Sequence, residues 1–330
     1  MIVTKTPFRI SFFGGGSDIE EYFNKYGGAV ISTTIDKYVY VTVRHLPRFF
    51  DYSTEIKYSS TERVNDVDEI QHPMIRNAIK LMDMKDLFIS YDADLPSKSG
   101  LGTSSTFAVG LTNAFELLKN KKLSKDDLAR KAIYIERKLC NESGGWQDQI
   151  AAAYGGFNKI TFANNNFKVT PIRISNYRKN KLNSCLLMYF TGFTRYSSEI
   201  QKNFNIKDRK PIIDEMVKLV NESQKILENK RRNLDDFGRL LHKEWNLKRQ
   251  VNDKVSNNEI DDLYELGIKN GALGGKLLGA GGGGFMIFYV PLKEQKKFRK
   301  AFSKYMEVPF SFDKKGSEAI YSRAEKLESY

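Results

Sequence analysis

A turn rich in glycine and hydroxyl residues, at positions 95–107, constrains the fold of this chain more than any other segment. It reads Leu-Pro-Ser-Lys-Ser-Gly-Leu-Gly-Thr-Ser-Ser-Thr-Phe, and apolar residues at helical spacing continue from it as far as Leu118. A loop that opens a helix presents unpaired N–H groups and the positive end of the helix dipole. Such a site binds phosphate oxygens, and glycine lets the ligand approach the backbone. A capped helix after a polar loop is the alternative interpretation.

Two further glycine clusters stand near the ends of the chain. Gly14–Gly16 precedes Ser17 and Asp18, so Asp18 is either a helix cap or a carboxylate that faces a polyhydroxyl substrate. Gly279–Gly284 contains the GxGxxG pattern, but a dinucleotide-binding motif must open a helix. The apolar run Phe285–Val290 predicts a strand there instead. We therefore expect this cluster to bring the backbone close to a ligand or to another loop, rather than to form a simple flexible turn.

Length and composition indicate a globular protein with a substantial core. The chain has 330 residues, enough for two domains, and 41% of them are hydrophobic. We see no apolar run that approaches the ~20 residues of a membrane helix, and no secretory leader. The two cysteines, Cys140 and Cys185, form no CxxC pair, so we expect buried free thiols and a cytoplasmic protein. The three histidines lack metal-ligand spacing, which argues against zinc.

The net charge of +13 allows three interpretations. Nucleic-acid binding is one, but the basic residues are spread along the chain rather than gathered in a block with aromatic residues. A general bias in composition is the second and the simplest. A positive field that steers anionic small substrates into a cleft is the third. We expect no nucleic-acid or membrane partner.

Strands and helices are expected to group in an α+β arrangement rather than to alternate regularly. The polar, basic stretch 175–183 is our candidate boundary, which gives an N-terminal domain of residues 1–178 and a C-terminal domain of residues 179–330. We expect strands at 1–13, 29–35, 37–44, 55–58, 87–91, 157–162, 167–174, 185–190, 285–290 and 308–312, and helices at 18–25, 70–82, 103–118, 125–140, 146–153, 212–227, 235–251, 259–270 and 294–305.

The three glycine segments, taken in order, resemble the three motifs of the GHMP small-molecule kinases. The first reads Pro-Phe-Arg-Ile-Ser-Phe-Phe-Gly-Gly-Gly-Ser-Asp from Pro7, the second Pro-Ser-Lys-Ser-Gly-Leu-Gly-Thr-Ser-Ser from Pro96, and the third Lys-Leu-Leu-Gly-Ala-Gly-Gly-Gly-Gly from Lys276. The second motif has Thr103 where the family usually has serine, which keeps the hydroxyl. Residues 144–149 and 191–195 are most similar to the heptose 7-phosphate kinase branch of the family.

The resemblance implies a two-domain fold with the active site between the domains. The N-terminal domain would be like ribosomal protein S5 domain 2, and the C-terminal domain would be ferredoxin-like. The implied reaction is ATP- and Mg²⁺-dependent phosphorylation of the anomeric (C1) hydroxyl of D-glycero-D-manno-heptose 7-phosphate to the 1,7-bisphosphate, for nucleotide-activated heptose in surface polysaccharide. A fucose- or galactose-type sugar kinase is the alternative, and a non-catalytic sugar sensor belongs to a different class. The protein would be a monomer or a homodimer.

The same resemblance assigns roles to residues. Asp148 would be the catalytic base, or would only orient the hydroxyl, and Arg9 would hold it ionised; a surface ion pair is the other interpretation of Arg9. Ser104 and Glu136 would bind Mg²⁺, although Glu136 also fits an ordinary solvated helix position. Candidates for the distal phosphate are Lys5, Lys98, Arg195 and Lys276, which the sequence does not rank. The amides expected to hold ATP are those of Ser99, Gly100, Leu101, Gly102, Thr103, Ser104 and Ser105, and the residues expected at the substrate are Asp18, Gly14, Gly15, Gly16, Ser17, Gly281, Gly282 and Gly283.

Overall fold

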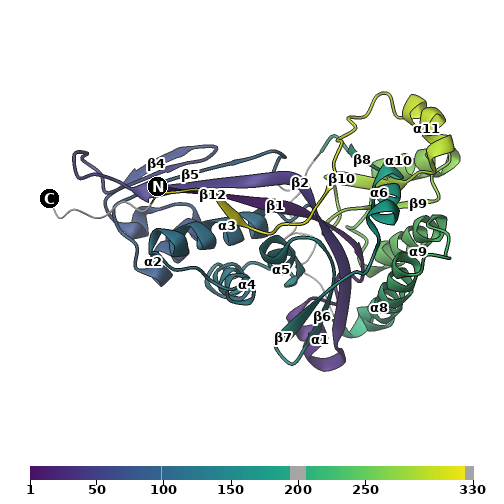
Figure 1. Ribbon diagram of the computed structural model, residues 1–330, viewed down its shortest axis with the longest axis horizontal. Helices are drawn as coiled ribbons and strands as arrows, with labels where there is room; N and C mark the ends of the chain where they lie inside the picture. The colour runs from purple at the N-terminus through teal and green to yellow at the C-terminus, as the bar shows by residue number, and fades with distance from the viewer. Residues whose placement is uncertain (98, 194–205, 324–330) are drawn as a thin grey trace.

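A long, nine-stranded sheet forms one half of the protein and a three-stranded sheet belongs to the other half (Figure 1). The computed structural model describes residues 1–97, 99–193 and 206–323. The first sheet is built on the antiparallel pair β1 (Ile2–Phe13) and β2 (Gly28–His45). Its other strands from the first half of the chain are β3 (Thr54–Lys57), β4 (Thr61–Val64), β5 (Leu87–Ala93), β6 (Phe157–Ala163) and β7 (Asn166–Pro171).

Strand β2 is continuous, which corrects the expectation of two strands at 29–35 and 37–44. Its register against β1 shifts between Pro7, opposite Tyr38, and Arg9, opposite Thr34, so the extra residues are accommodated in an irregularity of the ladder. Asp36 lies in that irregularity, and its N–H donates to the carbonyl of Ser311 at 2.9 Å. The backbone N–H of a polar residue that would end an isolated strand is therefore hydrogen-bonded to a distant segment.

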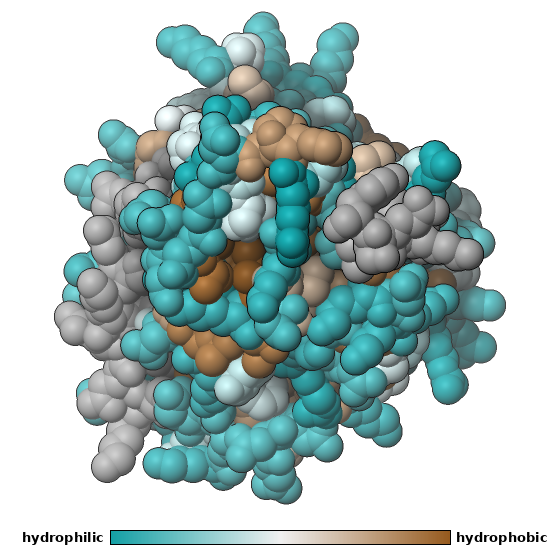
Figure 2. All heavy atoms as spheres, turned by 90° about the vertical axis from the view of Figure 1, so that its left-hand side faces the viewer, coloured by the Kyte–Doolittle hydropathy of each residue, from teal (hydrophilic) through white to brown (hydrophobic). Residues whose placement is uncertain are grey.

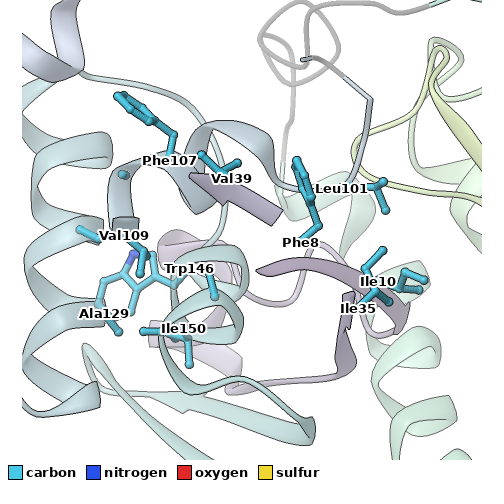
Figure 3. Close-up of a cluster of buried hydrophobic side chains, with 14 of the residues drawn as sticks. Phe8, Ile10, Ile35, Val39, Leu101, Phe107, Val109, Ala129, Trp146 and Ile150 are labelled. Carbon is cyan, nitrogen blue, oxygen red and sulfur yellow. The ribbon is translucent and has the colours of Figure 1, made fainter. Parts of the chain in front are cut away.

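Helices pack on the first sheet and bury a large apolar core. Figure 3 shows part of it: Val109, Ala129, Trp146 and Ile150 lie in one group, and Phe8 of β1 lies on the other side of the view, near Leu101 and Ile35. Phe8 and Ile150 are fully buried. Trp146 immediately precedes the short helix that carries Asp148, so the core fixes the start of that helix. The helical elements of this half are α1 (Glu20–Tyr26), η1 (Val67–Glu69), α2 (Pro73–Met82), α3 (Thr103–Leu118), α4 (Lys125–Ile133), the π-helical η2 (Tyr134–Leu139) and α5 (Gln147–Tyr154).

The second sheet has the order β8-β10-β9. The strand expected at 308–312 is divided: Val308 N–H donates to Met188 O on one edge of this sheet, whereas Phe312 pairs with β2 of the other sheet. The elements that follow in the second half of the chain are α6 (Asn176–Ser184), β8 (Leu186–Phe190), α8 (Ile206–Glu228), α9 (Asp235–Val251), α10 (Asn258–Lys269), β9 (Gly274–Leu277), β10 (Phe285–Tyr289), η3 (Leu292–Glu294), α11 (Gln295–Ala301), β11 (Phe312–Asp313) and β12 (Glu318–Ser322).

The boundary between residues 178 and 179 stays a prediction, and strand pairing argues for a different assignment of the C-terminal residues. Strand β11 pairs with β2 and β12 pairs with β1, so residues 312–322 join the first sheet (Figure 1). The polar stretch chosen as the candidate boundary forms the helix α6. Arg178 in α6 is buried and donates to the carbonyls of Ile226, Leu227 and Arg232. A basic residue of the candidate boundary therefore anchors the helix to the end of α8 and the segment that follows it.

Hydrophilic side chains cover most of the end of the molecule that carries β4 and α2, around a hollow with hydrophobic residues at its floor (Figure 2). Within residues 1–97, 99–193 and 206–323, no helix is long and apolar enough to cross a membrane. Cys140 and Cys185 are both free; Cys185 is buried, as expected, whereas Cys140 is only partly buried.

Candidate active site

The second glycine segment folds as the sequence predicts, into a loop that opens helix α3. Gly100 and Gly102 have φ angles of 83° and 79°, a region that favours glycine. Thr103 begins the helix, and Ser104 is exposed at its first turn. The free N–H groups of this turn therefore face the space beside the loop, which is the arrangement that binds phosphate.

The third glycine segment packs directly on this loop. A Cβ at Gly279 would lie 2.4 Å from Gly100 Cα, and one at Gly284 would lie 2.3 Å from Ser99 O. The N–H of Phe285 donates to that same Ser99 carbonyl at 3.2 Å. Of the two interpretations of these glycines, close approach to another loop is confirmed. The two motifs, about 180 residues apart, form one backbone surface.

Arg9 and Asp148 form a two-pronged ion pair beside the loop. Arg9 Nε donates to Asp148 Oδ1 and Nη2 donates to Oδ2, both at 2.7 Å. The remaining prong, Nη1, donates to Gly100 O at 2.8 Å. The Arg9 side chain is 5% exposed and that of Asp148 is 19% exposed, so this is not a surface pair. One guanidinium thus joins β1, α5 and the phosphate loop in a fixed geometry.

Glu136 is buried, which excludes the solvated-helix interpretation. The expected helix 125–140 becomes π-helical at Tyr134–Leu139, and Glu136 lies in that part. Its Oε2 accepts from Ser105 Oγ at 2.7 Å and from Gln149 Nε2 at 2.6 Å. Ser105, rather than the neighbouring Ser104, is therefore the hydroxyl bound to this carboxylate. π-helical turns are frequent at functional sites.

Asp18 is fixed at the edge of the same space by backbone donors. Its Oδ1 accepts from Gly16 N–H at 3.0 Å and its Oδ2 accepts from Gln147 N–H at 3.2 Å. A Cβ at Gly145 would lie 1.9 Å from Oδ2, so only glycine fits there. Burial, and secondly the charge of Asp148, raise the pKa of Asp18 above its ordinary value. Asp18 lies just before α1 and accepts no hydrogen bond there as a helix cap.

Two lysines and a glutamate from the second half complete the charged groups. Lys276 Nζ donates to Phe12 O at 2.8 Å and pairs with Glu244 Oε1 at 3.4 Å. The same Oε1 accepts from Gly14 N–H at 3.1 Å. Burial lowers the pKa of Lys276, against the opposing effect of Glu244. Lys248 Nζ donates to two carbonyls of the third motif.

These groups surround one cavity of about 270 Å³. Most predicted site residues line it: Arg9, Gly15, Gly16, Asp18, Ser99, Gly100, Gly102, Thr103, Ser104, Ser105, Glu136, Asp148, Lys276, Gly281 and Gly283. Gly14, Ser17, Leu101 and Gly282 do not line it. Ser17 Oγ instead donates to Gly14 O and Ala29 O, which closes the loop from behind, and the Leu101 side chain is fully buried in the core.

The four candidates for the distal phosphate fare differently. Lys276 lines the cavity, whereas Lys5 pairs with Glu318 at 3.6 Å at the edge of the first sheet. Lys98 and Arg195 lie outside the described residues. The structure adds cavity residues that the sequence analysis missed, among them Arg137 and Lys248.

A sequence signal for two of the missed residues existed in α9. Its buried face includes Phe237, Leu241 and Trp245. Glu244 and Lys248 fall on the same face by helical spacing, so two charged residues interrupt an apolar stripe. Charges in such positions are rarely tolerated without partners, and this pattern could have identified them.

Mg²⁺ binding requires oxygen donors, and the cavity offers them. Mg²⁺ usually takes one or two protein carboxylates, and phosphate oxygens and water complete its shell. Ser104 and Glu136 line the cavity on the side of the phosphate loop, and the second Glu136 oxygen, Oε1, lies 3.8 Å from Arg137 Nη1. Across the described ranges, no cluster of three or more His, Cys, Asp or Glu could hold a metal without such help. The donor set fits a Mg²⁺ ion that is bound together with a nucleotide.

Comparisons with known proteins agree with this geometry. Residues 72–156 match the GHMP kinases N terminal domain and residues 210–308 match the GHMP kinases C terminal domain. The D-glycero-alpha-D-manno-heptose 7-phosphate kinase of Campylobacter jejuni is 36% identical, and the alignment covers 96% of this chain and 97% of that protein.

Solved structures show the same architecture. A D-glycero-D-manno-heptose 1-phosphate kinase from Bacteroides thetaiotaomicron superposes with a TM-score of 0.79 at 26% identity, and the match covers 98% of this chain and 100% of that one. Lactococcus lactis galactokinase, solved with galactose, gives a TM-score of 0.73 at 16% identity over 97% of this chain and 95% of its own, which shows the fold alone. The chain therefore belongs to the GHMP kinase family, has its two-domain α+β fold, and is an ATP-dependent kinase.

Proposed function

We propose that this protein phosphorylates the anomeric (C1) hydroxyl of D-glycero-D-manno-heptose 7-phosphate with ATP and releases the 1,7-bisphosphate. The observation that carries the proposal is the Asp148–Arg9–Gly100 contact, which places a fixed carboxylate beside the phosphate loop. The heptose assignment rests on the Campylobacter jejuni relative, which is named as a heptose 7-phosphate kinase. A role in nucleotide-activated heptose synthesis and a cytoplasmic location follow from the same assignment.

The geometry suits proton removal from an alcohol next to a nucleotide. Asp148 accepts the proton of the sugar hydroxyl, whose oxygen forms a bond to the γ-phosphorus while the bond from that phosphorus to the β–γ bridging oxygen breaks, and ADP leaves. Arg9 fixes both carboxylate oxygens, so Asp148 keeps one orientation as the proton arrives. The N–H groups at the start of α3 stabilise the phosphate oxygens. Asp18 orients other hydroxyls of the sugar.

Ser104 and Glu136 are the residues that would hold Mg²⁺. When bound, the ion neutralises charge on the phosphate oxygens of the nucleotide. Ser105 and Gln149 hold Glu136 Oε2 in place and leave Oε1 for the metal. Their role is to keep the buried carboxylate oriented toward the cavity.

The relatives' names differ on the position of the phosphate. The Campylobacter protein is named for the 7-phosphate and the Bacteroides protein for the 1-phosphate. An assay that couples ADP release to a spectroscopic signal should include heptose 7-phosphate, unphosphorylated heptose, fucose and galactose, and phosphorus NMR should locate the new phosphate. Preferred turnover of heptose 7-phosphate, with a new signal at C1, supports the proposal. Faster turnover of fucose or galactose would replace it with the alternative sugar kinase.

The Asp148→Asn variant tests the chemistry. Asparagine keeps the size of the side chain but cannot accept a proton, so turnover should fall by about 10²–10⁴-fold. Binding of ADP should stay close to that of the wild type, because the phosphate loop is made by other residues. Turnover within a few-fold of the wild type would remove Asp148 from the role of base.

A further inference from the structure

Three ion pairs form at the cavity, and among the described residues they leave the cation Lys248 and the carboxylates Asp18 and Glu142 without a partner of opposite charge. Arg9 pairs with Asp148, Arg137 approaches Glu136 at 3.8 Å, and Lys276 pairs with Glu244. Lys248 also lines the cavity, yet among the described residues no carboxylate lies within 4.0 Å of its Nζ.

Lys248 is held in place by neutral acceptors. Its Nζ donates to Leu277 O at 2.7 Å and to Gly279 O at 2.6 Å. An ammonium has three N–H donors, so one remains for a ligand. Gly279 packs against Gly100 of the phosphate loop, and the ammonium is therefore fixed where the third motif meets the second.

Keeping a partly buried ammonium charged without a counterion costs free energy, and the net effect of the groups around Lys248 acts in the same sense. Burial, and secondly the charge of Lys276, lower the pKa of Lys248 well below its ordinary value. The charge of Glu244 acts in the opposite direction and that of Arg9 in the same direction. An anion bound in the cavity would supply the missing negative charge.

We propose that Lys248 contacts a phosphoryl group of a bound substrate through its free N–H. This inference rests on the proposed function, because that function brings two phosphorylated molecules into the cavity. The phosphoryl group belongs either to the 7-phosphate of the sugar or to the nucleotide. Asp18 is the corresponding carboxylate, because it has no cationic partner among the described residues. In the proposed function it faces the neutral hydroxyls of the sugar.

The test is the Lys248→Gln variant, which keeps an N–H donor for the two carbonyls but removes the charge. Lys243→Gln is the matched control, because Lys243 lies on the same helix and is exposed. For each protein, kcat/KM is measured with heptose 7-phosphate and with unphosphorylated heptose at saturating ATP. KM for ATP and the melting temperature are measured in parallel.

Loss of one charged hydrogen bond predicts a fall of about 10- to 100-fold. If the 7-phosphate is the partner, kcat/KM falls for heptose 7-phosphate and not for heptose. If the nucleotide is the partner, KM for ATP rises and both sugars are affected equally. Either result, at an unchanged melting temperature, supports the proposal.

Values of Lys248→Gln within about threefold of those of Lys243→Gln would overturn it, as the expected loss is at least ~10-fold. So would a loss that Lys248→Arg, which restores the charge, fails to recover in part. Calorimetric binding of ADP and of both sugars provides the same comparison without turnover. If wild-type protein binds ADP but phosphorylates no heptose, the proposed function fails while the ADP titration still decides whether Lys248 contacts phosphate.

Discussion

Adding a single methyl group at Gly145 should disturb the position of the Asp18 carboxylate in the active site. A Cβ there would lie 1.9 Å from Asp18 Oδ2 and 2.2 Å from Asp18 Cγ. The Asp18 side chain cannot move away easily, because its carboxylate accepts hydrogen bonds from the N–H groups of Gly16 and Gln147. In the Gly145→Ala variant, either the carboxylate leaves its two donors or the segment before α5 moves away.

The expected cost follows from these contacts. Overpacking costs about 1–3 kcal/mol, and each lost hydrogen bond to a carboxylate costs about 1.5–3 kcal/mol. If the structure relaxes by breaking one of the two bonds, the sum is roughly 2.5–6 kcal/mol of unfolding free energy. Because Asp148 lies three residues after Gly145, we also expect kcat/KM to fall by about 100-fold or more, as small displacements in active sites do.

Urea unfolding and steady-state kinetics measure the two effects. Gly15→Ala is the control for stability: Gly15 belongs to the loop before Asp18, its φ is not in the left-handed region, and a Cβ there meets nothing within 4 Å. Its unfolding free energy should match that of the wild type. If Gly145→Ala unfolds and turns over like the wild type, the Asp18–Gly145 contact does not constrain the site and our reasoning about this corner is wrong.

Two further substitutions test the buried charges. Glu244→Gln leaves Lys276 buried without a carboxylate and should lower the unfolding free energy by about 3 kcal/mol. The control Glu222→Gln breaks an exposed pair with Arg232 and should lower it by less than ~1 kcal/mol. Equal losses in urea unfolding would contradict this prediction. For Asp18, whose folded-state pKa is raised, the stabilising contribution is present below the unfolded value of about 4 and is lost as the pH rises through the folded value. Wild type should therefore lose stability relative to Asp18→Asn as the pH rises above about 4, and a difference that is constant with pH would contradict it.

Local signals in the sequence predicted much of the fold. Helix α9 begins and ends where its periodicity indicates, at Asp235 and Val251, and the phosphate loop opens α3 as expected. Three features escaped prediction because they depend on distant contacts. Strand β2 continues through Asp36, whose N–H donates to the distant Ser311 O. The helix at Glu136 becomes π-helical, and β12 returns to pair with β1. None of these partners is a neighbour in sequence.

The site was easier to predict than the second half of the protein that supports it. The motifs identified the Asp148–Arg9 side of the cavity, where chemistry and short-range pattern coincide. Glu244 and Lys248 were missed, because a charged residue in a helix is ordinary until its face is known to be buried. Glu244 pairs with the Lys276 side chain, but the other partners of Glu244 and Lys248 are backbone atoms of Gly14, Leu277 and Gly279, which no pairing of side chains could suggest.

The contacts explain why three glycine segments are needed to build one site. Phe285 N–H donates to Ser99 O, and Lys276 Nζ donates to Phe12 O, so the third motif is joined directly to the backbone of the first and second motifs. A Cβ at Gly279 or Gly284 would clash with the backbone of the phosphate loop, at 2.4 Å and 2.3 Å, so side chains there would force the loops apart. The close backbone packing fixes the phosphate loop and the lysines relative to each other before a substrate arrives. Few ionic contacts are then needed to position the charged side chains around the cavity, because the glycine segments have already fixed the distances between the loops that carry them.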